Sequence, residues 1–309
     1  MDTAVAFFVY NRPEHTRKSI EALISCSEVV DIPVYFFSDG PRSDLEKDSV
    51  GAVRAILMDE KRIPMKTVII ADGNMGLANS IISGVSKLFE KFNSVIVLED
   101  DLIVSEPFLA FMLKGLTKYR DSPKVGAICG YSPPLQGNNI PDYFFLRGAD
   151  CWGWATWRRA WVNFNQNGLQ LYNEILQRGL GWDFNVNGSY PYMNMLRQQI
   201  EGKNNSWAIR WQASTYLSNF VTLYSRRTLV NNIGFDGSGT HCSKVDMMGR
   251  TNEFDEYAIG DLPDEIIDDE SVYRLLGAFY RTRQSWKFQV KWSLLNLIPH
   301  KCWKFQALE

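Results

Sequence analysis

Apolar runs alternate with helical patterns along the first hundred residues. The runs are short and rich in β-branched or aromatic residues, as buried strands are, and they lie at residues 3–10, 33–38, 66–71 and 94–98. Between them, apolar side chains recur at helical spacing, at residues 14–25, 44–58 and 76–92. Strands that alternate with helices indicate βαβ units. We therefore expect an α/β fold with a Rossmann-like, mostly parallel sheet flanked by helices.

The pattern becomes irregular beyond residue 131, where Gly, Asn and Trp are frequent. The remaining predicted elements are two helices and two strands, at residues 106–120 and 207–218 and at residues 125–129 and 221–225. Trp154, Trp157 and Trp161 recur at helical spacing, so we expect them on one face of a packed helix.

Charge divides the chain near residue 250. Residues 253–270 contain nine acidic residues, whereas residues 271–304 contain seven Lys or Arg and no acid. We expect a catalytic domain at residues 1–250, composed of a nucleotide-binding half (1–101) and a donor and acceptor half (102–250). Residues 251–309 are expected to form an acidic linker and a basic, aromatic tail.

The composition is that of a soluble globular protein, with 45% hydrophobic and 22% charged residues. The net charge of −2 argues against a generally basic nucleic-acid-binding protein, so no nucleic-acid partner is expected. Five Cys without a CxxC pair indicate neither a zinc site nor a disulfide framework. We find no signal-peptide pattern and no apolar run of membrane-spanning length, and we expect a cytoplasmic location.

The strongest chemical signal is an acidic cluster, Glu99, Asp100 and Asp101, directly after a predicted buried strand. Three crowded carboxylates repel one another unless a positive group joins them. A hard divalent cation that bridges two phosphates, Mn²⁺ or Mg²⁺, would do so. The alternative is a solvated turn that caps the next helix.

Arg12 and Asp39 follow two other predicted strands. Ligands of such sheets bind beyond the carboxyl ends of the strands, so these residues should converge with the acidic cluster on one crevice. A guanidinium can stack on a base or pair with phosphate, and a carboxylate can accept from a base or a ribose hydroxyl. The alternatives are a surface Arg and a turn-forming Asp.

Two loops carry further residues that could contact a ligand. Asp150 and Trp152 lie in a Gly-flanked loop, where an acid and an indole can contact a sugar. The Gly-rich loop 234–241 contains Asp236 and ends in His241, which could reach a metal or a phosphate as the loop closes. Both segments could also be ordinary loops.

Arg210 is a weaker candidate for binding the donor, and Asp183 is a weaker candidate for a catalytic residue. Arg210 lies between Trp207 and Trp211 on a predicted helix and could simply belong to its packing. Asp183 lies in a Gly- and Asn-rich loop beside Trp182, and no pattern places it.

The motifs YNRPEH, FFSDG, GLANSI, VIVLEDD and GADCWGW, taken in this order, resemble the nucleotide-sugar glycosyltransferases of the GT-A fold. The sequence is similar to N-acetylglucosaminyltransferase I and to bacterial family-2-like sugar transferases of surface polysaccharide synthesis, over roughly residues 3–242. The resemblance implies an inverting, Mn²⁺-dependent enzyme with a nucleotide-diphosphate sugar as donor.

The resemblance also implies roles for individual residues. Asp101 would contact the metal, Glu99 and Asp100 would face the ribose and the donor sugar, and Arg12 and Asp39 would contact the nucleotide. The catalytic base cannot be carried over, because the segment between Trp207 and Trp211 has no acid. Four candidate bases remain, of which the first is favoured: Asp150, Asp183, Glu201 and Asp236.

These features predict glycosyl transfer to a glycan or lipid-linked saccharide acceptor. A nucleotidyltransferase or sugar-nucleotide pyrophosphorylase is the alternative enzyme, although YNRPEH lacks the Gly-rich loop such enzymes carry. A non-catalytic carbohydrate-binding protein is the alternative of another class. In the tail, residues 281–304 interleave basic with aromatic and aliphatic side chains. This pattern indicates peripheral contact with an anionic membrane at the inner face of the cytoplasmic membrane, or a helix packed on the domain.

Overall fold

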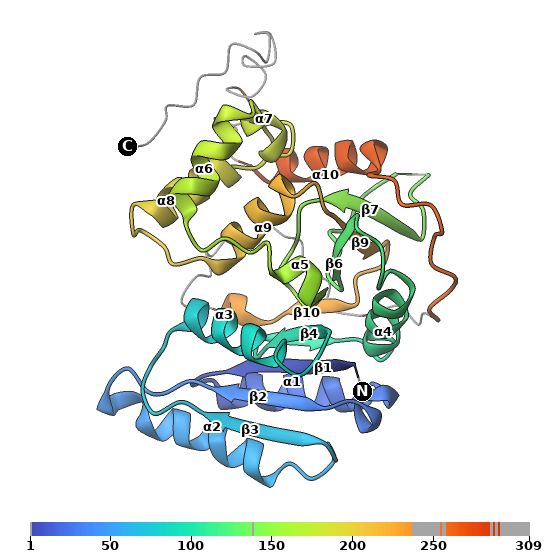
Figure 1. Ribbon diagram of the computed structural model, residues 1–309. Helices are drawn as coiled ribbons and strands as arrows, with labels where there is room; N and C mark the ends of the chain where they lie inside the picture. The colour runs from blue at the N-terminus through green and yellow to red at the C-terminus, as the bar shows by residue number, and fades with distance from the viewer. Residues whose placement is uncertain are drawn as a thin grey trace.

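The computed structural model describes residues 2–137, 139–236, 254, 258–284, 287 and 290. Its main sheet contains β1 (Thr3–Val9), β2 (Val34–Ser38), β3 (Lys66–Ile70), β4 (Ser94–Glu99), β6 (Val125–Cys129), β7 (Tyr143–Arg147), β8 (Trp154–Trp157) and β9 (Val221–Ser225). The strand order is β3-β2-β1-β4-β8-β6-β9-β7 (Figure 1). A two-stranded ribbon joins β5 (Leu102–Val104) to β10 (Val230–Asn232).

The first four strands form the parallel half of the sheet. β1 lies between β2 and β4, and Phe7 is in register with Phe36 on one side and Leu98 on the other. β8 runs antiparallel to both of its neighbours, β4 and β6, and β6 pairs in parallel with β9. The expected α/β fold with a mostly parallel sheet is therefore confirmed.

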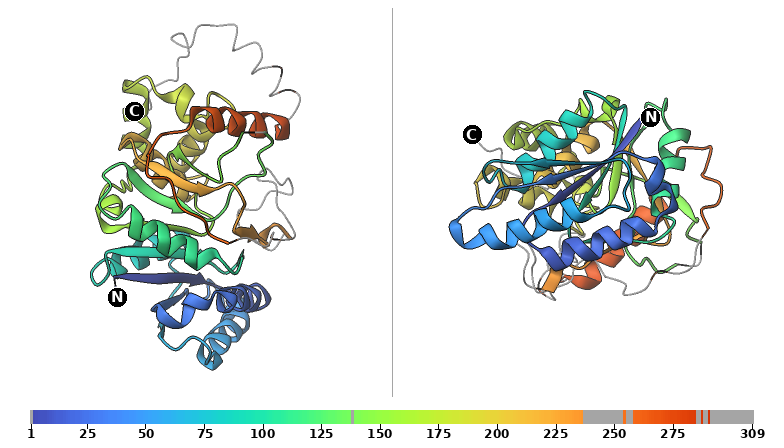
Figure 2. Two further views of the ribbon diagram at one scale, coloured as in Figure 1. Left: turned by 90° about the vertical axis from the view of Figure 1, so that its right-hand side faces the viewer. Right: turned by 90° about the horizontal axis from the view of Figure 1, so that it is seen from below.

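Helices cover both faces of this parallel half (Figure 2). They are α1 (Pro13–Ser25) and α2 (Lys47–Asp59) on one face and α3 (Leu77–Leu88) on the other, whereas α4 (Phe108–Lys118) packs against β6 and β8. Side chains of β1 alternate between the faces: Val5 and Phe7 pack in the core with α1 and α2, whereas Ala6 and Phe8 pack in the core with α3. Pro13 begins α1 at a position where its missing N–H costs nothing.

Most helices of the second half were not predicted from the sequence pattern. These elements are α5 (Arg158–Trp161), α6 (Gly168–Gln177), α7 (Gly181–Phe184), α8 (Tyr192–Ile200), α9 (Trp207–Leu217) and α10 (Glu270–Arg283). Only α9 was predicted. α6, α8 and α9 share a hydrophobic cluster of their own.

The prediction that one helix carries Trp154, Trp157 and Trp161 is wrong for the first two residues. Trp154 and Trp157 lie in strand β8, and only Trp161 is helical. Because β8 is central and all four of its residues are buried, it shows no polar alternation that would have indicated a strand. Trp154 packs against Trp207 and Trp211 of α9, with ring centroids 5.3 and 5.7 Å away.

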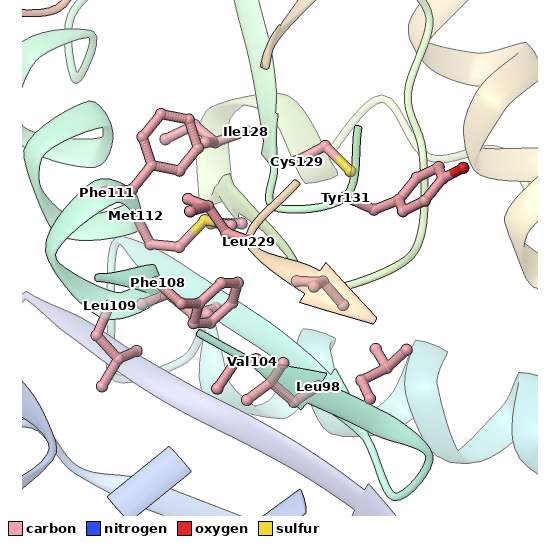
Figure 3. Packing of buried hydrophobic residues seen from close by; sticks show 14 of the residues in the cluster. Leu98, Val104, Phe108, Leu109, Phe111, Met112, Ile128, Cys129, Tyr131 and Leu229 are labelled. Carbon is pink, nitrogen blue, oxygen red and sulfur yellow. The ribbon is translucent and has the colours of Figure 1, made fainter. Parts of the chain in front are cut away.

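A core beneath the end of β4 fixes the ribbon of β5 and β10 (Figure 3). Leu98 of β4, Val104 of β5 and Leu229 before β10 are buried there with Phe108 and Met112 of α4. This packing determines where the residues between β4 and β5 lie.

Residues 258–284 pack on the domain and contribute to its main core. Tyr273 and Tyr280 of α10 are buried in the same cluster as β1 and α1. Lys114 of α4 pairs with Asp261 at 3.2 Å, and Lys118 pairs with Asp264. We expected an acidic linker here. Instead, the segment that begins at residue 258 lies along α4, and the helix α10 that follows packs on the domain. Most of the predicted basic tail lies outside the described residues.

No helix in the described part of the chain is long and apolar enough to span a membrane.

Candidate active site

The acidic cluster lies at the carboxyl end of β4. Glu99 is the last residue of the strand, and Asp100 and Asp101 form the turn into β5. Asp100 is only 4% exposed, and its carboxylate accepts a hydrogen bond from the Tyr10 N–H at 3.2 Å. The hydroxyl of Ser19 donates to the Asp100 carbonyl at 2.9 Å. α1 and the end of β1 therefore hold this turn in place.

Arg12 lies inside the cluster. Its guanidinium forms ion pairs with the carboxylates of Asp100 and, at 3.0 Å, Asp101. Burial opposes the charge of Arg12, but the two carboxylates outweigh it and raise the pKa of the guanidinium above its ordinary value. The predicted convergence of Arg12 with the acidic cluster is thus present, and Arg12 neutralises part of its charge.

One guanidinium does not balance three carboxylates. Burial raises the pKa of Asp100 to about 6, although Arg12 acts in the opposite direction. Burial, followed by repulsion from Asp101 and Asp100, raises the pKa of Glu99 well above its usual range. The cluster therefore favours the binding of a further positive group.

The donor chemistry of this cluster fits a hard divalent cation in part. Within the part of the chain that the structure describes, no group of three or more His, Cys, Asp or Glu side chains is arranged as a complete metal site. A cation such as Mg²⁺ needs only one or two carboxylates when phosphate oxygens and water complete its coordination. Glu99 and Asp101 are the partly accessible carboxylates that could serve in this way.

Asp39 organises the loop that leads into α3. Its carboxylate accepts from the backbone N–H groups of Gly40, Met75 and Gly76 at 2.7–2.9 Å, and from the Asn74 side chain at 3.1 Å. These four donors match the acceptor capacity of a carboxylate. The turn-forming role of Asp39 is therefore observed, and its contact with a nucleotide stays a prediction.

A cavity of about 250 Å³ adjoins Asp39 between α3 and strands β2 and β3. Phe37, Ile69 and Met75 are among its apolar lining residues, and Lys87 also lines it. The cavity thus joins apolar walls to the strand end that bears Asp39.

The loop between β7 and β8 carries Asp150. Gly148 and Gly153 both adopt positive φ angles, 85° and 60°, which favour glycine. Asp150 accepts from the Cys151 N–H at 2.7 Å. Burial raises the pKa of Asp150 to about 6, opposed by hydrogen bonds from the N–H groups of Cys151 and Trp152. Asp150 nevertheless keeps part of its surface exposed, which a group that exchanges protons with a ligand requires.

This loop lies beside the acidic cluster. The loop precedes β8, and Trp154 of β8 is in register with Val97 of β4, so the loop leaves the sheet beside the end of β4. Trp152 contacts Tyr131 and Phe235 edge to face, with centroid distances of 4.7 and 5.6 Å. Trp152 thus lies next to the segment that abuts Asp101, whereas Asp150 lies on the same loop and its approach to the acidic cluster stays a prediction.

The segment after β10 closes the cluster on another side. The Ile233 N–H donates to the Asp101 carbonyl at 2.9 Å, and Gly234 abuts the Asp101 carboxylate. Asp236 pairs with His15 of α1 at 3.2 Å. Asp236 thus approaches the cluster from the side of α1. The predicted metal ligand His241 lies outside the described residues.

Other predicted residues have structural partners in the second half of the molecule. Asp183 pairs with Arg147 at 2.8 Å and accepts from the Tyr216 hydroxyl. Arg210 is 7% exposed and donates to the Ser206 carbonyl at 3.1 Å, as helix packing would require. Glu201 pairs with Lys203 at 2.6 Å. The predicted functional roles of Asp183, Arg210 and Glu201 stay predictions.

Three tyrosines near Asp150 were missed by the sequence analysis: Tyr190, Tyr192 and Tyr280. After burial, the charge of Asp150 contributes to raising the pKa of each of them. The Tyr-Pro-Tyr sequence at 190–192 was a weak signal of an aromatic loop. No local signal indicated Tyr280, because α10 is brought there by the fold.

No model of a known protein family matches the chain, and no curated protein matches it. Among solved structures, it is similar to S. aureus TarS 1–349 in complex with UDP-GlcNAc, with 11% identity and a TM-score of 0.34 over 46% of this chain and 37% of that chain. The chain thus spans well under half the length of that structure.

The chain is also similar to the mannosyltransferase PcManGT from Pyrobaculum calidifontis in complex with GDP-Man and Mn²⁺. Identity is 12% and the TM-score 0.38, over 70% of this chain and 69% of that chain.

Proposed function

We propose that this chain transfers a sugar from a nucleotide-diphosphate donor to a hydroxyl group of an acceptor saccharide. The observation that carries the proposal is the acidic cluster at the end of β4, where one Arg faces Glu99, Asp100 and Asp101. The cluster lies at the carboxyl end of a parallel strand, where sheets of this kind bind ligands.

The donor would bind across the ends of β1, β2 and β4. Arg12 offers a cation to the diphosphate, and the apolar cavity beside Asp39 suits a flat nucleobase. When bound to Asp101 and the diphosphate, a divalent cation, Mn²⁺ or Mg²⁺, would offset the negative charge that develops on the leaving group. Glu99 and Asp100 would then face the ribose and the donor sugar.

Asp150 is the group best placed to act as the catalytic base. It is partly exposed on the loop that leads into β8, the neighbour of β4, and its pKa of about 6 lies close to neutral pH, where a base is most effective. It would take the proton of the acceptor hydroxyl as the oxygen attacks the anomeric carbon and the nucleoside diphosphate leaves. A single displacement of this kind inverts the configuration. Asp183, by contrast, is held in an ion pair with Arg147.

The acceptor is proposed to be a glycan or a lipid-linked saccharide, as in bacterial surface polysaccharide synthesis. The basic, aromatic sequence at 281–304 supports peripheral contact with the inner face of the cytoplasmic membrane, where such a lipid-linked acceptor would be found.

A nucleotide panel tests the proposal and separates it from its rivals. UDP, GDP, CDP and dTDP should be added, each with and without Mn²⁺, while the melting temperature is recorded. A transferase should be stabilised by at least one diphosphate in the presence of the metal, whereas a carbohydrate-binding module should respond to none. A pyrophosphorylase would form a nucleotide sugar from a nucleoside triphosphate and a sugar phosphate, and this product would contradict the proposal.

A further inference from the structure

The cavity beside Asp39 runs along one face of helix α3. The helix begins next to Asp39, whose carboxylate accepts from the Gly76 N–H at 2.9 Å. From the helix itself, residues at three- or four-residue spacing line the cavity: Ser80, Ser83, Gly84 and Lys87. At a rise of 1.5 Å per residue, Lys87 lies about 10 Å further along the helix axis than Ser80. Lys87 therefore lines the end of the cavity that is remote from Asp39.

The distance from the cavity to the acidic cluster suits a nucleoside diphosphate. Asp39 follows β2 and Asp100 follows β4, and β1 lies between these two strands. Neighbouring strands lie about 4.8 Å apart, so the two strand ends are separated by about 10 Å. A nucleotide whose phosphates reach Arg12 would thus place its ribose near Asp39 and its base in the cavity. The base edge opposite the ribose would then face Lys87.

Hydrogen-bond acceptors at the mouth of the cavity are already engaged. The carboxylate of Asp39 accepts four hydrogen bonds from its own loop. The Ser38 carbonyl accepts from the Ala71 N–H at 2.9 Å, and the Ala71 carbonyl accepts from Arg54 at 3.0 Å. These bonds shape the mouth, and they leave the polar side chains of α3 to contact a base.

Ser83 and Lys87 offer an acceptor next to a donor. The Ser83 hydroxyl donates to the Asn79 carbonyl at 2.6 Å, so its proton is engaged and its oxygen is left to accept. The Lys87 ammonium has three donors and no acceptor. Side chains four residues apart on a helix are neighbours, and Cα–Cβ bonds tilt toward the helix N-terminus. The Lys87 side chain therefore begins in the direction of Ser83.

This pair matches one of the two classes of nucleobase. Away from the ribose, uracil, thymine and guanine carry a ring N–H beside a carbonyl oxygen, whereas cytosine and adenine carry a ring nitrogen acceptor beside an amino donor. We propose that Ser83 accepts from the ring N–H and that Lys87 donates to the carbonyl oxygen, so that the donor nucleotide has a uracil, thymine or guanine base. This inference rests on the proposed function and specifies its donor.

Isothermal titration with pairs of nucleotides of equal ring size tests the inference. UDP is compared with CDP, and GDP with ADP, on the full chain with Mn²⁺. At least one carbonyl-bearing nucleotide should bind about tenfold or more tightly than its amino counterpart, as expected for a hydrogen bond to a charged group. Lys87→Met keeps the apolar stem and should reduce this ratio to about threefold or less. Lys87→Arg keeps a charged donor and should preserve the preference.

Inorganic pyrophosphate with Mn²⁺ is the probe without a base. It should bind Lys87→Met and the wild type equally, because Lys87 is remote from the proposed phosphate site. Lys91→Met is the matched control, since Lys91 is exposed just beyond α3 and lies outside the residues that line the cavity. It should change neither the affinities nor their ratio.

Three results would overturn the inference: CDP and ADP binding as tightly as UDP and GDP, a ratio that Lys87→Met leaves unchanged, or an equal loss of pyrophosphate and nucleotide binding in that variant. In each of these cases the diphosphates still bind with Mn²⁺, so the proposed donor chemistry stands. If the wild type binds no nucleoside diphosphate at all, the proposed function itself has failed, and the inference fails with it.

Discussion

Gly234 abuts Asp101 so closely that a Cβ on the glycine would overlap the Asp101 Oδ2. The contact joins two segments that are distant in sequence, the turn after β4 and the turn after β10. A hydrogen bond of 2.9 Å from the Ile233 N–H to the Asp101 carbonyl holds the same two segments together. The orientation of the proposed metal ligand therefore depends on a glycine in a different part of the chain.

We predict that Gly234→Ala impairs donor binding more than folding. The added methyl group should displace the Asp101 carboxylate and weaken Mn²⁺-dependent nucleotide binding by about 1.5–3 kcal/mol, the usual contribution of a contact to a charged group. Isothermal titration of the nucleotide with Mn²⁺ measures this loss. Gly51→Ala is the control, because nothing lies within 4 Å of a Cβ at this exposed helical position. That control should keep binding intact and stabilise α2 slightly; similar losses in both variants would contradict the prediction.

Arg12 should be essential for stability as well as for binding. Arg12→Met leaves the buried carboxylate of Asp100 without its ion-pair partner, so we expect a loss of about 3–5 kcal/mol in the free energy of unfolding. Adding Asp100→Asn to the same chain should recover part of that loss, since the uncompensated charge is gone. Urea unfolding at neutral pH measures both variants. Additive effects of the two substitutions would show that the pair is not coupled.

The activity should fall at acidic pH with the protonation of Asp150. A base must be ionised to accept a proton, and the pKa of Asp150 is about 6. We therefore expect kcat/KM to be constant above this pH and to decrease by about tenfold per pH unit well below it. Because the pKa of Asp100 is also about 6, nucleotide affinity must be measured at each pH so that a loss of donor binding is separated from a loss of chemistry.

Asp150→Asn should lower kcat by about 10²–10⁴-fold while it leaves nucleotide affinity unchanged. Asp183→Asn is its matched control, since it removes an acid that the structure places in an ion pair with Arg147. If Asp183→Asn abolishes turnover and Asp150→Asn does not, the assignment of the base is reversed.

The proposed membrane contact is tested with a truncation that respects the fold. A chain that ends at residue 284 retains α10 and its buried side chains, whereas an end near residue 270 would remove part of the core. The full chain should float with anionic vesicles at low salt, and the truncated chain should not. Each Lys or Arg near such a surface contributes about 1 kcal/mol, and salt screens this attraction. Flotation of neither form, or of both equally, would contradict a role for the tail.

The parallel half of the fold was predictable because its strands and helices carry their own signals. The apolar runs that became β1, β2, β3 and β4 are bounded by polar turns, and the helices between them are amphipathic. The position of the acidic cluster follows directly, since Glu99 ends a strand whose other residues are buried. Its closeness to Arg12 could also be inferred, because both follow neighbouring parallel strands.

The second half could not be predicted in the same way. β8 is buried on both faces, so the spacing of Trp154 and Trp157 resembled that of a helix. α7 has four residues, too few for a periodic pattern. The charge contrast near residue 250 concealed that several acids between 261 and 270 pair with basic side chains of the domain, as Asp268 does with Arg147. The burial of Tyr280 in the main core depends on these long-range contacts, and no local sequence pattern encodes them.

The cluster at the end of β4 is proposed to bind a nucleotide-diphosphate sugar for transfer. The most direct measurement is the release of nucleoside diphosphate from a panel of UDP-, GDP-, CDP- and dTDP-sugars, with methyl glycosides as acceptors and with Mn²⁺ or EDTA. We predict that one donor class is turned over with Mn²⁺ and not with EDTA, that a glycoside product accompanies the diphosphate, and that Asp101→Ala abolishes both while remaining folded. Turnover of no donor by the wild type, or equal turnover by Asp101→Ala, would contradict the account.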